Sequence, residues 1–278
     1  MLHGDAQRGE EDTLHPRITE LEDHLKRWPR VVVAYSGGVD STFLAAVAHR
    51  ALGRAALAVT LITESDAHDE MEFAVATART LGLNHRVERA PWLAIPGVAA
   101  NPLDRCYRCK RHLFGLLQGL AEAEGAVVLE GSNADDVTDY RPGMRAVQEL
   151  DVQSPLLQLG FVKSEIRELS RLLGLPSADR PSMACLASRF PFGATITEDT
   201  LQQVDRAERA LRELGLPVVR VRHHGDTARV EVAPQDLPAA FANRESVASR
   251  LRALGYSHVA LDLEGYRTGS MNPRPQRG

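Results

Sequence analysis

Short apolar runs alternate along the chain with segments in which apolar residues recur at helical spacing. The runs predict buried strands at residues 31–33, 55–63, 84–87 and 126–130, and the helical spacing predicts helices near residues 18–25, 39–47, 66–81 and 161–175. Strands that alternate with helices indicate a parallel sheet with helices on both faces. The pattern therefore predicts an α/β fold with a doubly wound parallel sheet.

The pattern changes near Thr197, where a second unit begins. A helix at 198–214, strands at 217–222 and 228–232, a helix near 244–254 and a strand at 257–263 form an αββαβ order. We expect an α/β domain at 16–194, a small α+β domain at 195–272 and disordered tails at 1–15 and 273–278. Small units of this order often associate with their own kind, so we expect a homo-oligomer, a trimer or a hexamer.

Composition narrows the class of protein. Hydrophobic residues make up 44% and charged residues 25% of the 278 residues, as in an ordinary globular protein. Apolar runs are too short for a membrane span and the N-terminus lacks the order of a signal peptide, so we expect a cytoplasmic protein. The net charge of −4 gives no overall attraction to nucleic acid. Three cysteines, an odd number, argue against a disulfide framework.

The segment VVVAYSGGVDSTFL at residues 31–44 carries the clearest chemistry. A strand leads into Ser36, Gly37 and Gly38, and a helix starts near Asp40 and Ser41. Two glycines let the backbone turn with its N–H groups inward, and the helix N-terminus adds a positive dipole. This arrangement predicts a site for an anion, most plausibly a phosphate.

Asp40 stands where a mononucleotide P-loop would have a lysine. An acidic residue beside a phosphate site is consistent with bound Mg²⁺ and argues against simple cleavage of the γ-phosphate. The six residues SGGVDS resemble the loop of the PP-loop ATP pyrophosphatases, which cut ATP between the α- and β-phosphates and leave AMP on a substrate oxygen. The alternative is a glycine-rich turn without a ligand.

A polar run follows the strand predicted at 126–130. It begins at Gly131 and contains three aspartates in five residues, Asp135 among them. Its position, level with the loop at 36–41, favours a Mg²⁺ and substrate site over a solvated loop. Lys163, at the start of the helix predicted at 161–175, is the expected additional phosphate contact, although a surface lysine is the alternative.

All three cysteines fall in two short segments. Cys106 and Cys109 form a CxxC pair among basic residues, which favour thiolates, and Cys185 stands alone in RPSMACLASRFPFG. A lone CxxC is also typical of a redox pair or half a zinc site, and a lone cysteine is more often a small buried residue. Counted together, the three can hold three irons of a [4Fe–4S] cluster and leave the fourth open.

Six segments together resemble the ATP-dependent sacrificial sulfur transferases of the LarE family, a resemblance that runs from about residue 15 to residue 272. The segments are SGGVDS, RCYRCK, EGSNADDVTDYRPGMRA, PSMACLASRFPFG, VRVRHHGDTARVEV and LDLEGYRTGSMN. The resemblance implies that ATP activates a carboxylate of pyridinium-3,5-biscarboxylic acid mononucleotide, which becomes a thiocarboxylate on the route to the nickel-pincer nucleotide cofactor. In one branch the cysteine matching Cys185 gives up its own sulfur and becomes dehydroalanine. In another, cysteines matching Cys106, Cys109 and Cys185 bind a [4Fe–4S] cluster that carries an extra sulfide and permits repeated turnover.

The residues are consistent with this chemistry. AMP leaves readily from an acyl-adenylate, whereas a free carboxylate would have to lose oxide. Mg²⁺ on Asp40 would stabilise departing pyrophosphate. Arg220 and Arg222 lie two apart on a predicted strand, so they share a face and are candidates to bind the substrate phosphate or carboxylates, or are surface charges. Glu208 is a further candidate metal ligand.

Three other hypotheses remain open at this point. Some PP-loop enzymes thiolate tRNA with three cysteines and a cluster, although the acidic net charge argues against nucleic acid as a partner. Cys185 is the candidate for sacrificial, single-turnover donation if the CxxC pair is only structural. A non-catalytic nucleotide-binding or zinc-binding regulator is the hypothesis from a different class.

Overall fold

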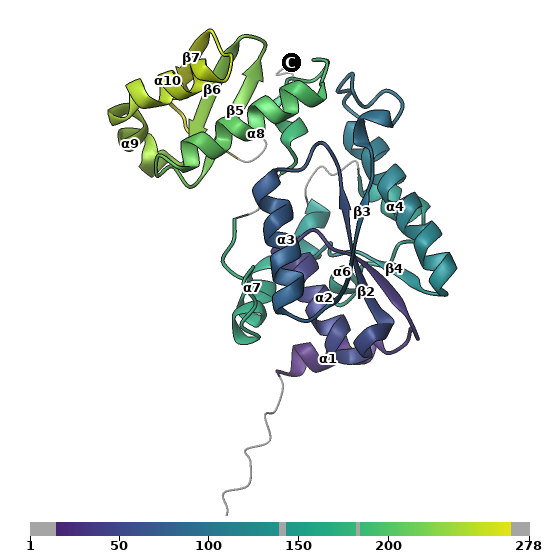
Figure 1. The fold of residues 1–278 in the computed structure, drawn as a ribbon. Coiled ribbons are helices and arrows are strands. Elements are labelled where there is room, and N and C mark those ends of the chain that lie inside the picture. Colours follow the sequence, from purple (N-terminus) through teal and green to yellow (C-terminus); the bar gives the residue numbers. More distant parts are fainter. Residues whose placement is uncertain (1–14, 139–142, 182–183, 268–278) are drawn as a thin grey trace, which may run out of the picture.

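A computed structural model describes residues 15–138, 143–181 and 184–267 of the chain. Its central sheet contains four parallel strands in the order β3-β2-β1-β4 (Figure 1). The strands are β1 (Val31–Ala34), β2 (Ala56–Ile62), β3 (Asn84–Arg89) and β4 (Val127–Leu129). Except for His15, the tails expected at 1–15 and 273–278 lie outside the described residues.

Helices cover both faces of this sheet, which confirms the doubly wound α/β class. One face packs against α1 (Pro16–Leu25), α2 (Val39–Leu52), α3 (His68–Thr80), α6 (Pro155–Gln158) and α7 (Lys163–Leu172). The other face packs against α4 (Arg105–Glu124) and α5 (Met144–Glu149). Alternation along β1 explains the two layers, because Val31 and Val33 face the first core while Val32 faces the second. Within the described ranges, no helix combines the length and the apolar character that a membrane span requires.

The strand order places a topological switch point beside β1. The chain continues from β1 to β2 and β3 on one side, and it later returns to β4 on the other side. Ligands of open α/β sheets bind at the carboxyl ends of strands where the order reverses in this way. The loop after β1 and the loop after β4 therefore lie side by side at the expected binding crevice.

The C-terminal elements build a second, three-stranded sheet with the order β5-β6-β7. Strands β5 and β6 are antiparallel, whereas β6 and β7 are parallel. The predicted helix-strand-strand-helix-strand order is confirmed, with one short helix, α9, added. The elements are α8 (Glu198–Arg212), β5 (Val219–His224), β6 (Thr227–Val232), α9 (Leu237–Ala242), α10 (Arg244–Ala253) and β7 (His258–Leu261).

Helix α8 contributes to two hydrophobic cores and connects the second sheet to the rest of the molecule (Figure 1). Leu201 and Val204, in its first half, pack in a core with Trp92 and Phe190. In its second half, Ala207 and Leu211 pack in the core of the second sheet. The described residues also form short 3-10 helices: η1 (Gly53–Ala55), η2 (Trp92–Ala94), η3 (Ala134–Thr138), η4 (Leu186–Arg189) and η5 (Pro234–Asp236).

Candidate active site

The loop between β1 and α2 is held closed by its own two serines. The Ser36 backbone N–H donates to Ser41 Oγ at 3.2 Å, and that hydroxyl donates to the Gly38 carbonyl at 3.2 Å. Gly38 precedes the first helical residue and makes no side-chain cap for α2. The first N–H groups of the helix, with the positive end of its dipole, are therefore directed at the crevice, where they can bind an anion.

Two glycines permit the close approaches that shape this loop. Gly37 has φ +77°, and a Cβ built on it would lie 2.7 Å from Cβ of Ala74 in α3. A Cβ on Gly131, in the loop after β4, would lie 3.1 Å from the Ser41 backbone nitrogen. A side chain at either position would push apart segments that form the crevice, so both predicted glycines have a steric reason to be there.

Asp40 connects three segments at the floor of the crevice. One carboxylate oxygen forms an ion pair with Lys163 Nζ, and the other accepts from Asn133 Nδ2 at 3.3 Å. Lys163 is the first residue of α7, and its backbone N–H donates to Asp135 Oδ2 at 2.8 Å. The predicted residues Asp40, Asp135 and Lys163 thus lie together, although they are far apart in the sequence.

A cavity of about 510 Å³ opens over this floor, at the carboxyl edge of the central sheet. Its lining contains five carboxylates but only two cationic side chains, so cations are favoured there. Arg180 and Glu70 form an ion pair in the lining, and the Arg180 guanidinium lies 3.6 Å from the centre of the Phe73 ring. The lining consists of Ser36, Gly38, Val39, Asp40, Asp66, Ala67, Glu70, Met71, Asn133, Asp135, Asp136, Lys163, Arg180, Pro181, Ala184 and Cys185.

Cys185 lies in that cavity, and the CxxC pair lies close to it. Cys106 and Cys109 lie in the first turns of α4, three residues apart and therefore on one face of the helix. Cys106 is exposed, Cys109 is half-buried against the core that contains Trp92, and Cys185 is exposed just before η4. The structure thus brings the third cysteine next to the pair, across about 80 residues of sequence.

Two of the thiols are poor acids in this setting. Burial, followed by the nearby Cys185, raises the pKa of Cys109 to about 12. Although Cys185 is exposed as a whole residue, the protein around its thiol desolvates it and raises its pKa, an effect that Arg105 and Arg189 partly oppose. Both side chains are therefore neutral thiols at pH 7 until a metal replaces their protons, as is usual for cysteine ligands.

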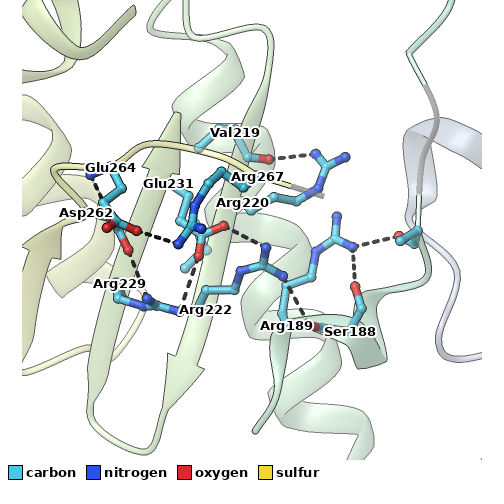
Figure 2. Close-up of polar contacts among 12 residues, drawn as sticks. Ser188, Arg189, Val219, Arg220, Arg222, Arg229, Glu231, Asp262, Glu264 and Arg267 are labelled. Carbon is cyan, nitrogen blue, oxygen red and sulfur yellow. Dashed lines mark hydrogen bonds and ion pairs between the residues drawn. The ribbon is translucent and has the colours of Figure 1, made fainter. Parts of the chain in front are cut away.

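A group of arginines, three of them buried and Arg229 half-buried, lies next to the segment that contains Ser188 (Figure 2). We call Arg189, Arg220, Arg222 and Arg229 the arginine cluster. Arg220 and Arg222 project from β5 and are only 3% and 4% exposed. Arg222 donates to Glu231 Oε2 at 2.6 Å and to the Ser188 carbonyl at 3.1 Å. Burial, and then the charge of Arg189, lower the pKa of Arg220, which reflects how closely the cations are gathered. Such a concentration of guanidinium groups favours an anion.

Glu208 is not free to act as a simple metal ligand, because its carboxylate is already engaged. It is fully buried and accepts from Arg189 at 2.8 and 2.9 Å, and one oxygen also accepts from the Val221 backbone N–H. Burial alone would raise the pKa of Glu208, but Arg189 outweighs it and holds that pKa below the usual range. A metal ion could reach Glu208 only by displacing Arg189.

Replacing Glu208 with glutamine should lower the free energy of unfolding by about 3 kcal/mol, because it leaves the buried Arg189 charge without its partner. Chemical denaturation would measure the change. Glu213→Gln is a matched control in the segment after α8, since its ion pair with Arg250 is exposed and worth about 0–1 kcal/mol. In the parent protein the contribution of Glu208 is present at neutral pH and is lost in acid, below the ordinary carboxyl range. Equal effects of the two substitutions would contradict this account.

Several residues of the site are not evident from the sequence. Asn133 falls inside the predicted polar run, so its position there is the only signal for it. Arg180 and Glu70 are separated by 110 positions, and their pairing depends on how α3 and the segment after α7 approach each other. Asp66 lines the cavity near the cysteines, and burial raises its pKa although Thr63 donates two hydrogen bonds to it.

Comparison with known proteins gives consistent matches. The asparagine synthase family model matches residues 21–180. The chain is 42% identical over 263 residues to an uncharacterized protein of Synechocystis sp., covering 93% of this chain and 98% of that protein. It is 37% identical over 262 residues to the pyridinium-3,5-bisthiocarboxylic acid mononucleotide synthase of Lactiplantibacillus plantarum, covering 94% and 95%. A subunit of GMP synthase from Methanopyrus kandleri is 31% identical over 177 residues, which cover 59% of this chain.

The parallel sheet, the glycine loop at its switch point and the matched family model define an ATP-using enzyme of the PP-loop class. Similarity to the GMP synthase subunit is confined to part of the chain, whereas the similarity to the pyridinium mononucleotide synthase runs through both sheets. The chain belongs to the LarE family and is an ATP-dependent, sulfur-transferring thiocarboxylate synthase.

Proposed function

We propose that this enzyme adenylylates the carboxylates of pyridinium-3,5-biscarboxylic acid mononucleotide and converts them to thiocarboxylates for a nickel-pincer nucleotide cofactor. The printed name of the Lactiplantibacillus plantarum relative supports the substrate. We further propose that the sulfur comes from a [4Fe–4S] cluster on Cys106, Cys109 and Cys185. The observation that carries the proposal is that Cys185 lines the same cavity as the loop at 36–41, with the CxxC pair beside it.

In the first half-reaction a substrate carboxylate oxygen attacks the α-phosphorus of ATP. An acyl-adenylate forms, the bond between the α-phosphorus and the bridging oxygen breaks, and pyrophosphate leaves. The N–H groups of the loop and of the α2 N-terminus bind the leaving group, and Lys163 adds a positive charge beside it. Asp40, Asp135 and Asp136 offer the oxygen ligands that Mg²⁺ prefers. When bound, Mg²⁺ would neutralise the developing charge on pyrophosphate.

In the second half-reaction Cys106, Cys109 and Cys185 would hold the sulfur source, whose sulfide-level sulfur would replace AMP at the acyl carbon. A C–S bond forms, the C–O bond to AMP breaks, and a thiocarboxylate and AMP result. Cys185 lines the same cavity as the loop at 36–41, so an acyl-adenylate bound there would lie near it. When bound, a cluster supplies a sulfur that can be replaced after each turnover, which spares the cysteine side chains.

The spacing of the three cysteines supports the proposal of a cluster over that of a single metal ion. Among the described residues, the group of three metal-binding side chains whose ligand atoms all lie within 4.8 Å of one another is His68, Asp69 and Glu72, not the cysteines. Sulfurs around one zinc ion share a single small coordination sphere, whereas each cysteine of a cluster binds a different iron. A [4Fe–4S] cluster requires three thiols that are neighbours but do not share one small coordination sphere.

The arginine cluster is the proposed site for the 5′-phosphate of the substrate. Arg222 donates to the carbonyl of Ser188, and Arg189 donates to the carbonyl of Cys185 at 3.0 Å. These bonds connect two guanidinium groups to the segment 185–188, which begins with Cys185. A mononucleotide anchored there by its phosphate would extend its ring toward Cys185.

The test is iron and acid-labile sulfide content, with an absorption spectrum, on protein reconstituted without oxygen. We expect about four irons and four sulfides per chain, and loss of most iron in Cys106→Ser and Cys109→Ser. Lys110→Ala, on the same helix turn, is the control and should retain the iron. Failure of the parent protein to take up iron, together with loss of about 34 Da (one H₂S) from Cys185 on turnover, would instead establish sacrificial donation.

The homo-oligomer stays a prediction. Strand β7 forms one edge of the second sheet, and β5 forms the other. Exposed strand edges are potential contact surfaces for another chain.

A further inference from the structure

A buried guanidinium joins the CxxC helix to the segment that carries Cys185. Arg105 immediately precedes Cys106 at the start of α4 and is only 5% exposed. One of its nitrogens donates to the carbonyl of Ala187 at 2.9 Å, and another lies 3.7 Å from Cys106 Sγ with hydrogen-bonding geometry. A single side chain thus contacts one cysteine directly and fixes the backbone two residues beyond another.

Asn101 also connects α4 to the segment that follows Cys185. It is fully buried with φ 50°, a conformation that asparagine tolerates better than most residues. Its side-chain oxygen accepts from Arg105, and its side-chain nitrogen donates to the carbonyls of Phe190 (3.2 Å) and Pro191 (2.6 Å). Its own carbonyl accepts from the Gly193 N–H at 2.9 Å. We call Asn101 and Arg105 the α4 clamp.

Arg105 forms no ion pair with a carboxylate in the described part of the chain. Its hydrogen-bond partners are two neutral oxygens and one sulfur. By contrast, the buried Arg189 and Arg222 each have a buried glutamate partner. Because a buried cation without an anion is costly, this position favours an anion, and the sulfur of Cys106 becomes one when a metal replaces its proton.

We infer that Arg105 is the positioning residue of the three-cysteine site: it sets the spacing of Cys106 from the Cys185 segment and supplies the positive charge that an anionic thiolate centre requires. The inference rests on the proposed cluster for the identity of that centre. The spacing it describes, however, belongs to the protein alone. Hydrogen bonds and charges beside cysteine ligands are known to set both the stability and the potential of iron–sulfur centres.

The first experiment compares Arg105→Met, Arg105→Lys and Arg108→Met after anaerobic reconstitution. Arg108 lies one turn along α4 with an exposed ion pair to Asp104, so Arg108→Met is the matched control. For Arg105→Met we expect at least tenfold faster loss of iron to a chelator and a more negative midpoint potential of the iron that remains. Arg105→Lys keeps the charge without the planar fork, so its potential should stay near the parent value while iron is lost faster. Parent-like retention and potential in Arg105→Met would overturn the inference.

A second experiment separates this inference from the cluster proposal. In metal-free Cys109→Ser protein, Cys106 and Cys185 are the remaining thiols, and a short bifunctional thiol reagent such as dibromobimane reports whether they are neighbours. We expect the yield of the cross-link to fall at least fivefold when Arg105→Met is added and to be unchanged with Arg108→Met, while circular dichroism shows a folded chain. If the parent protein binds no iron but the cross-link still depends on Arg105, the cluster proposal fails and the positioning role stands. A cross-link that is indifferent to both Arg105→Met and Arg105→Lys would overturn the positioning role.

Discussion

Replacing Asp40 with asparagine is expected to lower ATP-dependent release of pyrophosphate by about 100- to 1,000-fold, the usual effect of removing one electrostatic stabiliser of a leaving group. The substitution removes a carboxylate that can hold Mg²⁺ but keeps an oxygen that can accept from Asn133. It also leaves Lys163 without the anion with which it now pairs. The measurement is the rate of pyrophosphate formation with saturating ATP and the pyridinium dicarboxylate mononucleotide.

Asp23→Asn is the control for this prediction. Asp23 lies on α1 in an exposed pair with Lys26, and it is not part of the cavity lining. Its replacement should leave the rate within about twofold of the parent rate, because exposed pairs contribute little. Thermal unfolding of both variants would exclude a loss of folded protein. A pyrophosphate rate in Asp40→Asn that matches the control would contradict the proposed role of Asp40 in leaving-group stabilisation.

Replacing Cys185 with serine is expected to abolish thiocarboxylate formation, a loss of at least about 1,000-fold, while pyrophosphate release stays within about threefold of the parent rate. Serine is a hard oxygen ligand that neither binds iron as thiolate does nor carries a transferable sulfur. The residues proposed to bind pyrophosphate come from the loop at 36–41 and from α7, so the first half-reaction does not need the thiol. Mass spectrometry of the product and a pyrophosphate assay on the same samples measure the two steps separately.

Ala184→Ser is the control here, since it places the same hydroxyl one residue away in the same cavity lining. We expect it to retain most of the product. If Cys185→Ser lost both half-reactions equally, the thiol would be needed to form the acyl-adenylate. If it lost neither, the sulfur would have to be held by Cys106 and Cys109 without the third cysteine.

The fold class follows from local patterns that the structure confirms. The apolar run at 55–63 predicts a buried strand, and β2 occupies Ala56–Ile62 within it. The loop at 36–41 lies between a strand and a helix, as its glycines and flanking residues predict. Such elements depend on neighbours within a few positions along the chain, and therefore they can be read from the sequence.

Helix α4 and the polar contacts around it could not be predicted in this way. The first turns of α4 are crowded with arginine, lysine and cysteine, so the helical spacing of Phe114, Leu117 and Ala121 becomes clear only further along. Arg105 contacts a carbonyl 82 positions away, and no periodicity signals such a partner. Arg189 and Glu208 are 19 positions apart, and the chain between them passes from one hydrophobic core to another. The roles of residues at the site depend on such contacts between positions far apart in the sequence.

Helix α8 belongs to two hydrophobic cores, and its Glu208 holds Arg189 between Cys185 and the other members of the arginine cluster. These contacts set the distance between the proposed phosphate anchor and the sulfur. A substrate fits when the distance from its phosphate to its carboxylate matches that distance. Carbons 3 and 5 of a pyridinium ring are equidistant from its nitrogen, so a half rotation about the bond to the ribose exchanges their substituents. One anchored mononucleotide could thus present each carboxylate in turn to the same sulfur. Both carboxylates would then react at a single site, without release of the phosphate from its anchor.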